Sequence, residues 1–96
     1  MPIQLGNSTY ITQDPSINAR EFDGETVMMN KTLDSYFGLD EVATRIWQII
    51  EKQHTIIEIR DILVTEYDIS PEQCLDDIRP FIEKLITDEL AIIVES

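Results

Sequence analysis

Positive charge is scarce in this chain. Of its 96 residues, 7 are Lys or Arg and 19 are Asp or Glu, which leaves a formal net charge of −12 at pH 7. A surface with this balance repels phosphate backbones and anionic membranes, and it favours basic or neutral partners. We therefore expect neither nucleic acid nor a membrane among the partners of this protein.

Cysteine and histidine each occur once, as Cys74 and His54. A single cysteine forms no internal disulfide, and one Cys with one His cannot supply a tetrahedral zinc site. A Cys–His catalytic pair would also need an orienting group and an oxyanion site. Because Cys74 falls on an apolar helix face, where a free cysteine acts as a small hydrophobe, the sequence predicts no enzyme, no metal and no cofactor.

Long apolar runs are absent as well. No run approaches the roughly 20 residues that span a bilayer, and Met1-Pro2-Ile3-Gln4-Leu5 lacks the basic and apolar regions of a signal peptide. Gly6, Gly24 and Gly38 are isolated and form no phosphate-binding loop. A chain of this length makes one domain, so we expect a single cytoplasmic domain over residues 1–96.

The first third of the chain has the composition of strands. β-Branched and aromatic residues mark Ser8–Gln13, Ile17–Phe22 and Thr26–Asn30 as strands. Asp23-Gly24 between the last two is a two-residue hairpin signal. Tyr36-Phe37 is predicted as a short extended stretch before the first helix. This part of the sequence therefore predicts a small antiparallel sheet of three strands.

Helical signals fill the rest of the chain. Asp40 is predicted to cap a first helix that runs to about Lys52. Thr55-Ile56-Ile57-Glu58 is a capping box that opens a second helix ending at Glu66, and Ser70-Pro71-Glu72-Gln73 is a capping box for a third. The fold class that follows is α+β and winged helix-turn-helix-like, with a three-stranded antiparallel sheet followed by three helices.

Two details concern the end of the chain. Pro80 lies inside the third predicted helix, where a proline removes a hydrogen bond and clashes with the preceding turn. We expect a bend near Asp76–Arg79 rather than a break, because the apolar stripe continues in phase. Ala91–Val94 is apolar and can add a terminal strand or pack as a tail.

The third predicted helix has the wrong charge for reading DNA. In a nucleic-acid-binding helix-turn-helix, the second helix of the motif supplies Arg and Lys to phosphates and base edges. This segment offers acidic residues at Glu72, Asp76, Asp77, Glu83, Asp88 and Glu89, and basic residues only at Arg79 and Lys84. The fold is therefore predicted to serve another use, which we interpret as peptide binding.

An exposed strand edge provides a way to bind a peptide. A small sheet has at least one edge with unpaired N–H and C=O groups, to which an extended peptide can add as another strand. Val27-Met28-Met29 lies in the third predicted strand, and methionine adapts to varied side chains. The hypothesis is that a peptide adds along Thr26–Asn30.

Two other functions fit parts of the sequence. Leu33-Asp34-Ser35-Tyr36 is close to the Asp-Ser-Leu motif of acidic carrier proteins that hold a prosthetic group on serine. However, Tyr replaces Leu, and Ser35 precedes an extended stretch rather than a helix. The second alternative is a winged-helix regulatory protein that acts through protein–protein contacts, which would need a dimer surface or a sensor site.

The order and spacing of these residues resemble the PqqD-like family, the peptide-recognition elements of ribosomal peptide modification pathways. The resemblance runs from Asp23-Gly24 to Leu90. The matching residues are Val27-Met28-Met29-Asn30, Tyr36 through Ala43, Ile46-Trp47, Thr55 through Ile59, Leu63, Glu66 through Ile69, Asp77-Ile78, Phe81, Leu85 and Leu90. The Tyr36-Phe37-Gly38-Leu39 and Ala43-Thr44-Arg45-Ile46-Trp47 stretches look most like the stand-alone members that serve lasso-peptide pathways.

The resemblance implies a non-catalytic function. The protein would bind the leader of a precursor peptide along the third strand, in the cleft facing the third helix. It would present the precursor to a separate leader peptidase, which is a cysteine protease, and then to a cyclase. Carried onto this chain, the leader-binding residues would be Thr26, Val27, Met28, Met29 and Asn30 of the strand, with Cys74, Asp77, Ile78, Phe81 and Leu85 of the helix.

Overall fold

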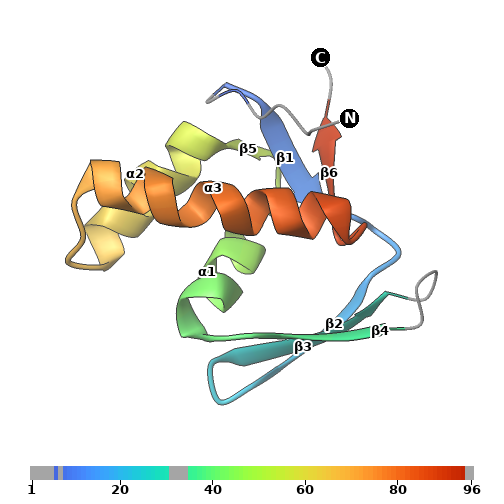
Figure 1. Cartoon of the computed structure of the whole chain (residues 1–96). Helices are drawn as coiled ribbons and strands as arrows, with labels where there is room; N and C mark the ends of the chain where they lie inside the picture. Colours follow the sequence, from blue (N-terminus) through green and yellow to red (C-terminus); the bar gives the residue numbers. More distant parts are fainter. Residues whose placement is uncertain (1–5, 7, 31–34, 95–96) are drawn as a thin grey trace.

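The computed structural model describes residue 6 and residues 8–30 and 35–94. In the described part of the chain, four strands come first, three helices with one short strand among them follow, and a strand comes last. Figure 1 shows two small sheets with the helices between and beside them. In chain order they are β1 (Tyr10–Gln13), β2 (Asn18–Phe22), β3 (Glu25–Asn30), β4 (Ser35–Leu39), α1 (Glu41–Ile49), β5 (His54–Thr55), α2 (Ile56–Glu66), α3 (Pro71–Thr87) and β6 (Ala91–Val94).

The described strands form two three-stranded antiparallel sheets, with orders β5-β1-β6 and β2-β3-β4. The α+β class and the helix-turn-helix are confirmed, but the prediction that the first three strands share one sheet is wrong. An Asx turn separates β1 from β2, because the Asp14 carboxylate accepts from the Ser16 amide at 2.8 Å. Ile11 in β1 is fully buried and pairs with Ile93 in β6.

The β2–β3 hairpin turns at Asp23-Gly24, the dipeptide from which the hairpin was predicted. Both turn residues have positive φ, 51° at Asp23 and 83° at Gly24, as a two-residue turn between right-twisted strands requires. The pairing aligns Phe22 with Glu25 and Asn18 with Met29. The predicted hairpin is confirmed.

The helix starts agree with the predicted caps. The Asp40 carboxylate accepts from the Ala43 amide at 2.9 Å, and Thr55 forms a reciprocal capping box with Glu58. Ser70 accepts from the amide of Gln73. The Gln73 side chain, however, donates to Asp77 at 2.9 Å, so only the serine half of the capping box predicted for the third helix is present.

Helix α3 continues through Pro80 to Thr87. Pro80 lies on the exposed side of the helix, and Ile78 and Ile82 on either side of it are buried. The apolar stripe keeps its phase across the proline, because packing of this face outweighs the lost hydrogen bond. The terminal segment forms strand β6, as one of the two predictions for it had proposed.

Helix α1 connects the two sheets. Figure 1 shows it standing between the β2-β3-β4 sheet and the other helices. Its last carbonyls accept hydrogen bonds from β1: the Gln13 side chain donates to Trp47 O at 2.7 Å, and the Gln13 amide and the Thr12 hydroxyl donate to Ile50 O at 2.9 Å each. These donors satisfy orphan carbonyls at the helix C-terminus. Trp47 and Ile50, which are 4% and 0% exposed, lie in the common core.

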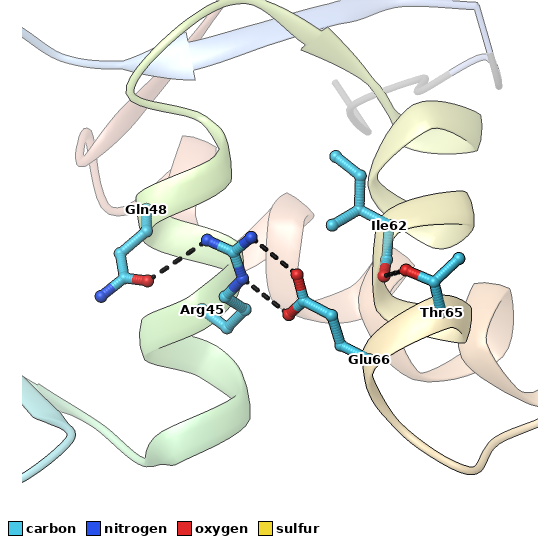
Figure 2. Close-up of polar contacts among 5 residues, drawn as sticks. All are labelled: Arg45, Gln48, Ile62, Thr65 and Glu66. Carbon is cyan, nitrogen blue, oxygen red and sulfur yellow. Dashed lines mark hydrogen bonds and ion pairs between the residues drawn. The ribbon is translucent and has the colours of Figure 1, made fainter.

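A polar network crosses the outer side of α1. The Arg45 guanidinium donates to both carboxylate oxygens of Glu66 in α2 at 2.7 Å each (Figure 2). It also donates to the Gln48 side-chain oxygen at 3.4 Å. Gln48 in turn donates to the Glu21 carboxylate in β2, so the network joins the hairpin sheet, α1 and α2. The hydrogen bond from Arg45 is the main cause that lowers the pKa of Glu66.

No helix in the described part of the chain is long and apolar enough to cross a membrane.

The Arg45–Glu66 pair should stabilise the fold in a pH-dependent way. We expect Glu66→Gln to lower the free energy of unfolding by about 0.5–1 kcal/mol near neutral pH, as for a well-oriented exposed pair. Because the folded-state pKa of Glu66 is lowered, this contribution is full above the unfolded pKa of roughly 4.3 and is lost as pH falls through the folded value. Urea denaturation of both proteins across this range measures it.

The matched control for that measurement is Asp61→Asn. Asp61 pairs with Arg60 at the same 2.7 Å, but the two residues are adjacent on α2 and join no separate elements. We expect this variant to change the free energy of unfolding by less than about 0.5 kcal/mol. Equal effects of the two substitutions would show that the Arg45–Glu66 pair has no bridging role.

Two buried threonines provide a second stability test. Thr26 is fully buried, and its hydroxyl has no hydrogen-bond partner among the described residues. Thr44 is also buried, but its hydroxyl donates to Leu39 O at 3.3 Å. Because an unmade buried hydrogen bond costs about 1–3 kcal/mol, Thr26→Val should stabilise the protein by about 1 kcal/mol. Thr44→Val should destabilise it by a similar amount. Thermal denaturation measures both variants, and a higher melting temperature for Thr44→Val than for Thr26→Val would contradict this account.

Candidate functional site

A groove lies between strand β4 and helix α3. It has a volume of about 300 Å³ and is mostly apolar. The lining residues come from three elements and the segments that follow them: Phe37, Gly38 and Leu39 of β4, Asp40 and Ala43 at the start of α1, Phe81, Lys84 and Leu85 of α3, and Asp88 and Leu90 after it.

Strand β4 forms the edge of its sheet along this groove. It pairs with β3 along its whole length: Leu39 lies opposite Thr26 at one end, and Ser35 lies opposite Asn30 at the other. Within the described residues, no strand pairs with its other side. An edge strand presents alternate N–H and C=O groups that another extended segment can pair with. The groove thus combines unpaired main-chain groups with an apolar surface.

The local sequence of β4 explains how this strand forms one wall of the groove. Phe37 and Leu39 alternate with Gly38, so both side chains face the helices, where Leu39 is buried and Phe37 is half-buried. At Gly38, an added Cβ would meet no atom within 4 Å, so the strand leaves open space there. The Asp40 cap then turns the chain into α1, which places Ala43 in the groove.

The other wall comes from one side of α3. Phe81 and Leu85 are four residues apart and therefore neighbours on the helix surface. Leu85 is 2% exposed and belongs to the core, whereas Phe81 is partly exposed. Lys84 and Asp88 form an ion pair of 3.1 Å at the same wall. Helix α3 and its C-cap therefore contribute an aromatic ring, an aliphatic side chain and a charged pair to the groove.

The structure corrects the predicted peptide-binding strand. Strand β3 pairs with β2 on one side and β4 on the other, so the prediction that a peptide adds along Thr26–Asn30 is wrong. A strand in the middle of a sheet already uses both sets of main-chain groups. Thr26 and Met28 are buried in the core, and Val27 is exposed on the sheet face away from the helices. The side chains of Met29 and Asn30 lie outside the described residues.

The predicted residues of α3 divide into two groups. Phe81 and Leu85 line the groove. Cys74 and Ile78 are 1% and 2% exposed and lie in the core, while Asp77 is exposed and accepts from Gln73. Sequence reasoning missed β4 as the edge, although the alternation around Phe37 and the cap at Asp40 marked a strand that ends at a helix.

Neither Cys74 nor His54 forms a catalytic arrangement. Burial, the largest cause, and the charge of Asp77 raise the pKa of the Cys74 thiol, so it stays protonated and is a poor nucleophile. His54 lies in β5, with its Nδ1 2.9 Å from Lys52 O. Among the residues described, no three His, Cys, Asp or Glu side chains gather as a metal site.

The serine proposed for a carrier protein is not at a helix start. Ser35 lies in strand β4 rather than at the helix start that a carrier protein needs.

Comparison with known proteins agrees with this fold. The structure of TbiB1 in complex with the TbiA(beta) leader peptide is 28% identical, with a TM-score of 0.80 over 88% of this chain and 99% of that one. A lasso peptide synthetase B1 complexed with the leader peptide is 21% identical, with a TM-score of 0.75 over 85% and 96%. The PqqD truncation of Methylobacterium extorquens PqqCD, described as a stand-alone recognition element for ribosomally synthesized and modified peptides, is 20% identical, with a TM-score of 0.78 over 95% and 97%.

No curated protein sequence matches the chain significantly. The family model described as coenzyme PQQ synthesis protein D (PqqD) matches residues 25–91, which is more than half of the chain and runs from strand β3 to the first residue of β6. The matched stretch includes both walls of the groove. This chain belongs to the PqqD family.

Proposed function

We propose that this protein binds the leader region of a ribosomally made precursor peptide, without performing chemistry on it. The leader would add as a strand to the free edge of β4 and place apolar side chains in the groove beside α3. The observation that carries this proposal is that the edge of β4 and the apolar groove lie along the same line of the surface. The leader complex of the 28% identical TbiB1 supports it.

Two kinds of interaction would supply the affinity. Main-chain hydrogen bonds to β4 contribute roughly 1 kcal/mol each after the loss of bonds to water. Burial of apolar leader side chains against Phe37, Phe81 and Leu85 contributes about 25 cal/mol for each Å² removed from water. Main-chain pairing is independent of sequence, so the apolar contacts would select the leader.

The pathway we propose is a lasso-peptide one. The bound precursor would be presented to a separate leader peptidase, a cysteine protease, and then to a cyclase. The support is the resemblance of the Tyr36–Leu39 and Ala43–Trp47 stretches to stand-alone lasso-pathway members. The residues that line the groove come from β4, α1, α3 and the segment after α3, so β1, β2 and α2 do not line it and are left for such enzymes to contact.

A charge placed in the groove should prevent leader binding. We expect Ala43→Glu to weaken binding of a fluorescein-labelled leader of a co-encoded precursor by about tenfold to a hundredfold, because the longer side chain fills part of the groove and places a charge against its apolar surface. Fluorescence anisotropy with a scrambled peptide as baseline measures the affinity. Val42→Glu is the matched control, since Val42 is 44% exposed on the same helix turn and does not line the groove.

The interpretation requires that both variants keep the fold, which thermal denaturation checks. Equal affinity of Ala43→Glu and Val42→Glu proteins would place the leader outside the groove. Absence of saturable binding to any such leader by the unmodified protein would overturn the proposed function as a whole.

Strand addition has its own signature in amide hydrogen exchange. Leader binding should slow exchange of amides in Ser35–Leu39 that face the free edge, because they gain main-chain acceptors. The edge strand β2 on the opposite side of the same sheet, Asn18–Phe22, is the internal control and should not change. Protection of β2 in place of β4 would contradict addition at the groove.

A further inference from the structure

Strand β6 has a second open edge, separate from that of β4. Strand β1 pairs with one side of β6, and within the described residues no strand pairs with its other side. The Gln13 amide, which lies opposite Ala91, donates to Ile50 O at 2.9 Å and so points away from β6. Because antiparallel pairs alternate between bonded and non-bonded, Ala91 and Ile93 direct their main-chain groups toward the open edge.

The side chains of this edge strand are all apolar. Strand β6 reads Ala91-Ile92-Ile93-Val94, and Ile92 and Ile93 are 40% and 36% exposed. Natural edge strands are commonly protected from pairing by charged residues, by proline or by a covering element. The edge strand β2 carries Arg20 and Glu21, but β6 has no charge and no proline in a chain of which 27% of residues are charged. This edge is therefore suited to pairing with another strand.

A hollow of about 290 Å³ lies against β6. Three of the four residues of the strand line it, and Ile86 of α3 adds another apolar side chain. Asp14 and Glu89 also line the hollow, and no Lys, Arg or His is among the described residues that do so. The open edge thus adjoins an apolar surface whose charged groups are all negative.

The charge of the chain decides which kind of partner fits this edge. A second copy would bring another net charge of −12 to the same surface, and like charges repel. An apolar strand flanked by Lys or Arg would instead be attracted by the field of the whole chain. This attraction requires no new ion pair with Asp14 or Glu89. The edge therefore favours a basic partner over self-association.

The hollow and the leader groove are separate but adjacent. They share no lining residue, so both can be occupied at once. The end of α3 nevertheless serves both, because Leu85 lines the groove and Ile86 the hollow. In the same way, Asp88 lines the groove and Glu89 the hollow. A partner paired with β6 would thus be held at the same helix end as the bound leader.

We infer that the open edge of β6 docks the enzyme that acts on the bound precursor, through an extended apolar segment of that enzyme flanked by Lys or Arg. The inference rests on the proposed function and adds the surface at which the enzyme contacts this chain. The main-chain groups of Ala91 and Ile93 pair with the segment. Its apolar side chains cover Ile92 and Ile93 and enter the hollow.

The probe for this inference is the purified, co-encoded leader peptidase, whose binding to the immobilised full chain is measured by biolayer interferometry. Ile93→Pro should weaken peptidase binding by about tenfold or more, because it removes an N–H that faces the open edge. The same N–H makes no bond to β1, so the β1–β6 pairing is kept. Ile93→Ala is the matched control, since it also shortens the side chain but keeps the N–H, and it should weaken binding by about threefold or less.

Both variants should bind the fluorescein-labelled leader as tightly as the unmodified protein does, because Ile93 does not line the groove. Thermal denaturation checks that each variant stays folded.

Two measurements on the unmodified protein need no substitution. The peptidase should slow amide hydrogen exchange at Ala91 and Ile93, whereas the leader alone should slow exchange in β4. Association with the peptidase should also slow by about threefold or more as NaCl is raised from about 50 to about 300 mM, because salt screens the attraction of a basic segment.

Different results separate the two proposals. A peptidase that does not bind, equal affinities of the Ile93→Pro and Ile93→Ala proteins, or unprotected β6 amides would overturn the inference and leave leader binding intact. An association rate that does not fall with salt would contradict a basic partner segment. A dimer of the protein alone that Ile93→Pro abolishes would assign the edge to a second copy and overturn the inference. Absence of leader binding by the unmodified protein would overturn the proposed function itself.

Discussion

The attachment of helix α1 to both sheets is the constraint on which the rest of this structure depends. Its first residues follow β4 directly, and its last carbonyls accept hydrogen bonds from Thr12 and Gln13 in β1. Trp47 and Ile50 bury the same helix in the common core. One short helix therefore sets the position of β4, and with it one wall of the groove, relative to the strands that hold the end of α3.

Two structural constraints produce the groove: the point where β4 ends and the side of α3 that is buried. Strand β4 must end at Asp40 so that α1 can begin, which keeps its outer edge next to α3. Helix α3 must bury Ile78, Ile82 and Leu85, which turns Phe81 toward that edge. A main-chain edge beside a partly exposed aromatic ring is a surface suited to an extended peptide, and the net negative charge restricts which peptides it suits.

The acidic character that argues against DNA binding has a structural counterpart. A helix-turn-helix that reads DNA presents its second helix to the major groove with basic side chains. Here the corresponding helix α3 presents Phe81 and the Lys84–Asp88 pair to the edge of β4 within the same molecule. One side of this helix therefore forms a wall of the groove, and its chemistry suits a peptide rather than a duplex.

The sequence by itself determined the local elements, because caps, turns and apolar periodicity act between neighbouring residues. Asp23-Gly24, Asp40 and Thr55 have the roles that their chemistry predicts. The resemblance named five residues of α3 for the cleft, and the sequence did not show that only Phe81 and Leu85 among them line the groove. Only the tertiary structure decided which strands pair, since β1 joins β6 near the other end of the chain. Pairing between distant segments depends on the shared burial of Ile11 and its neighbours in the core, and no local pattern encodes it. For that reason the edge at β4, rather than at β3, emerged only from the fold.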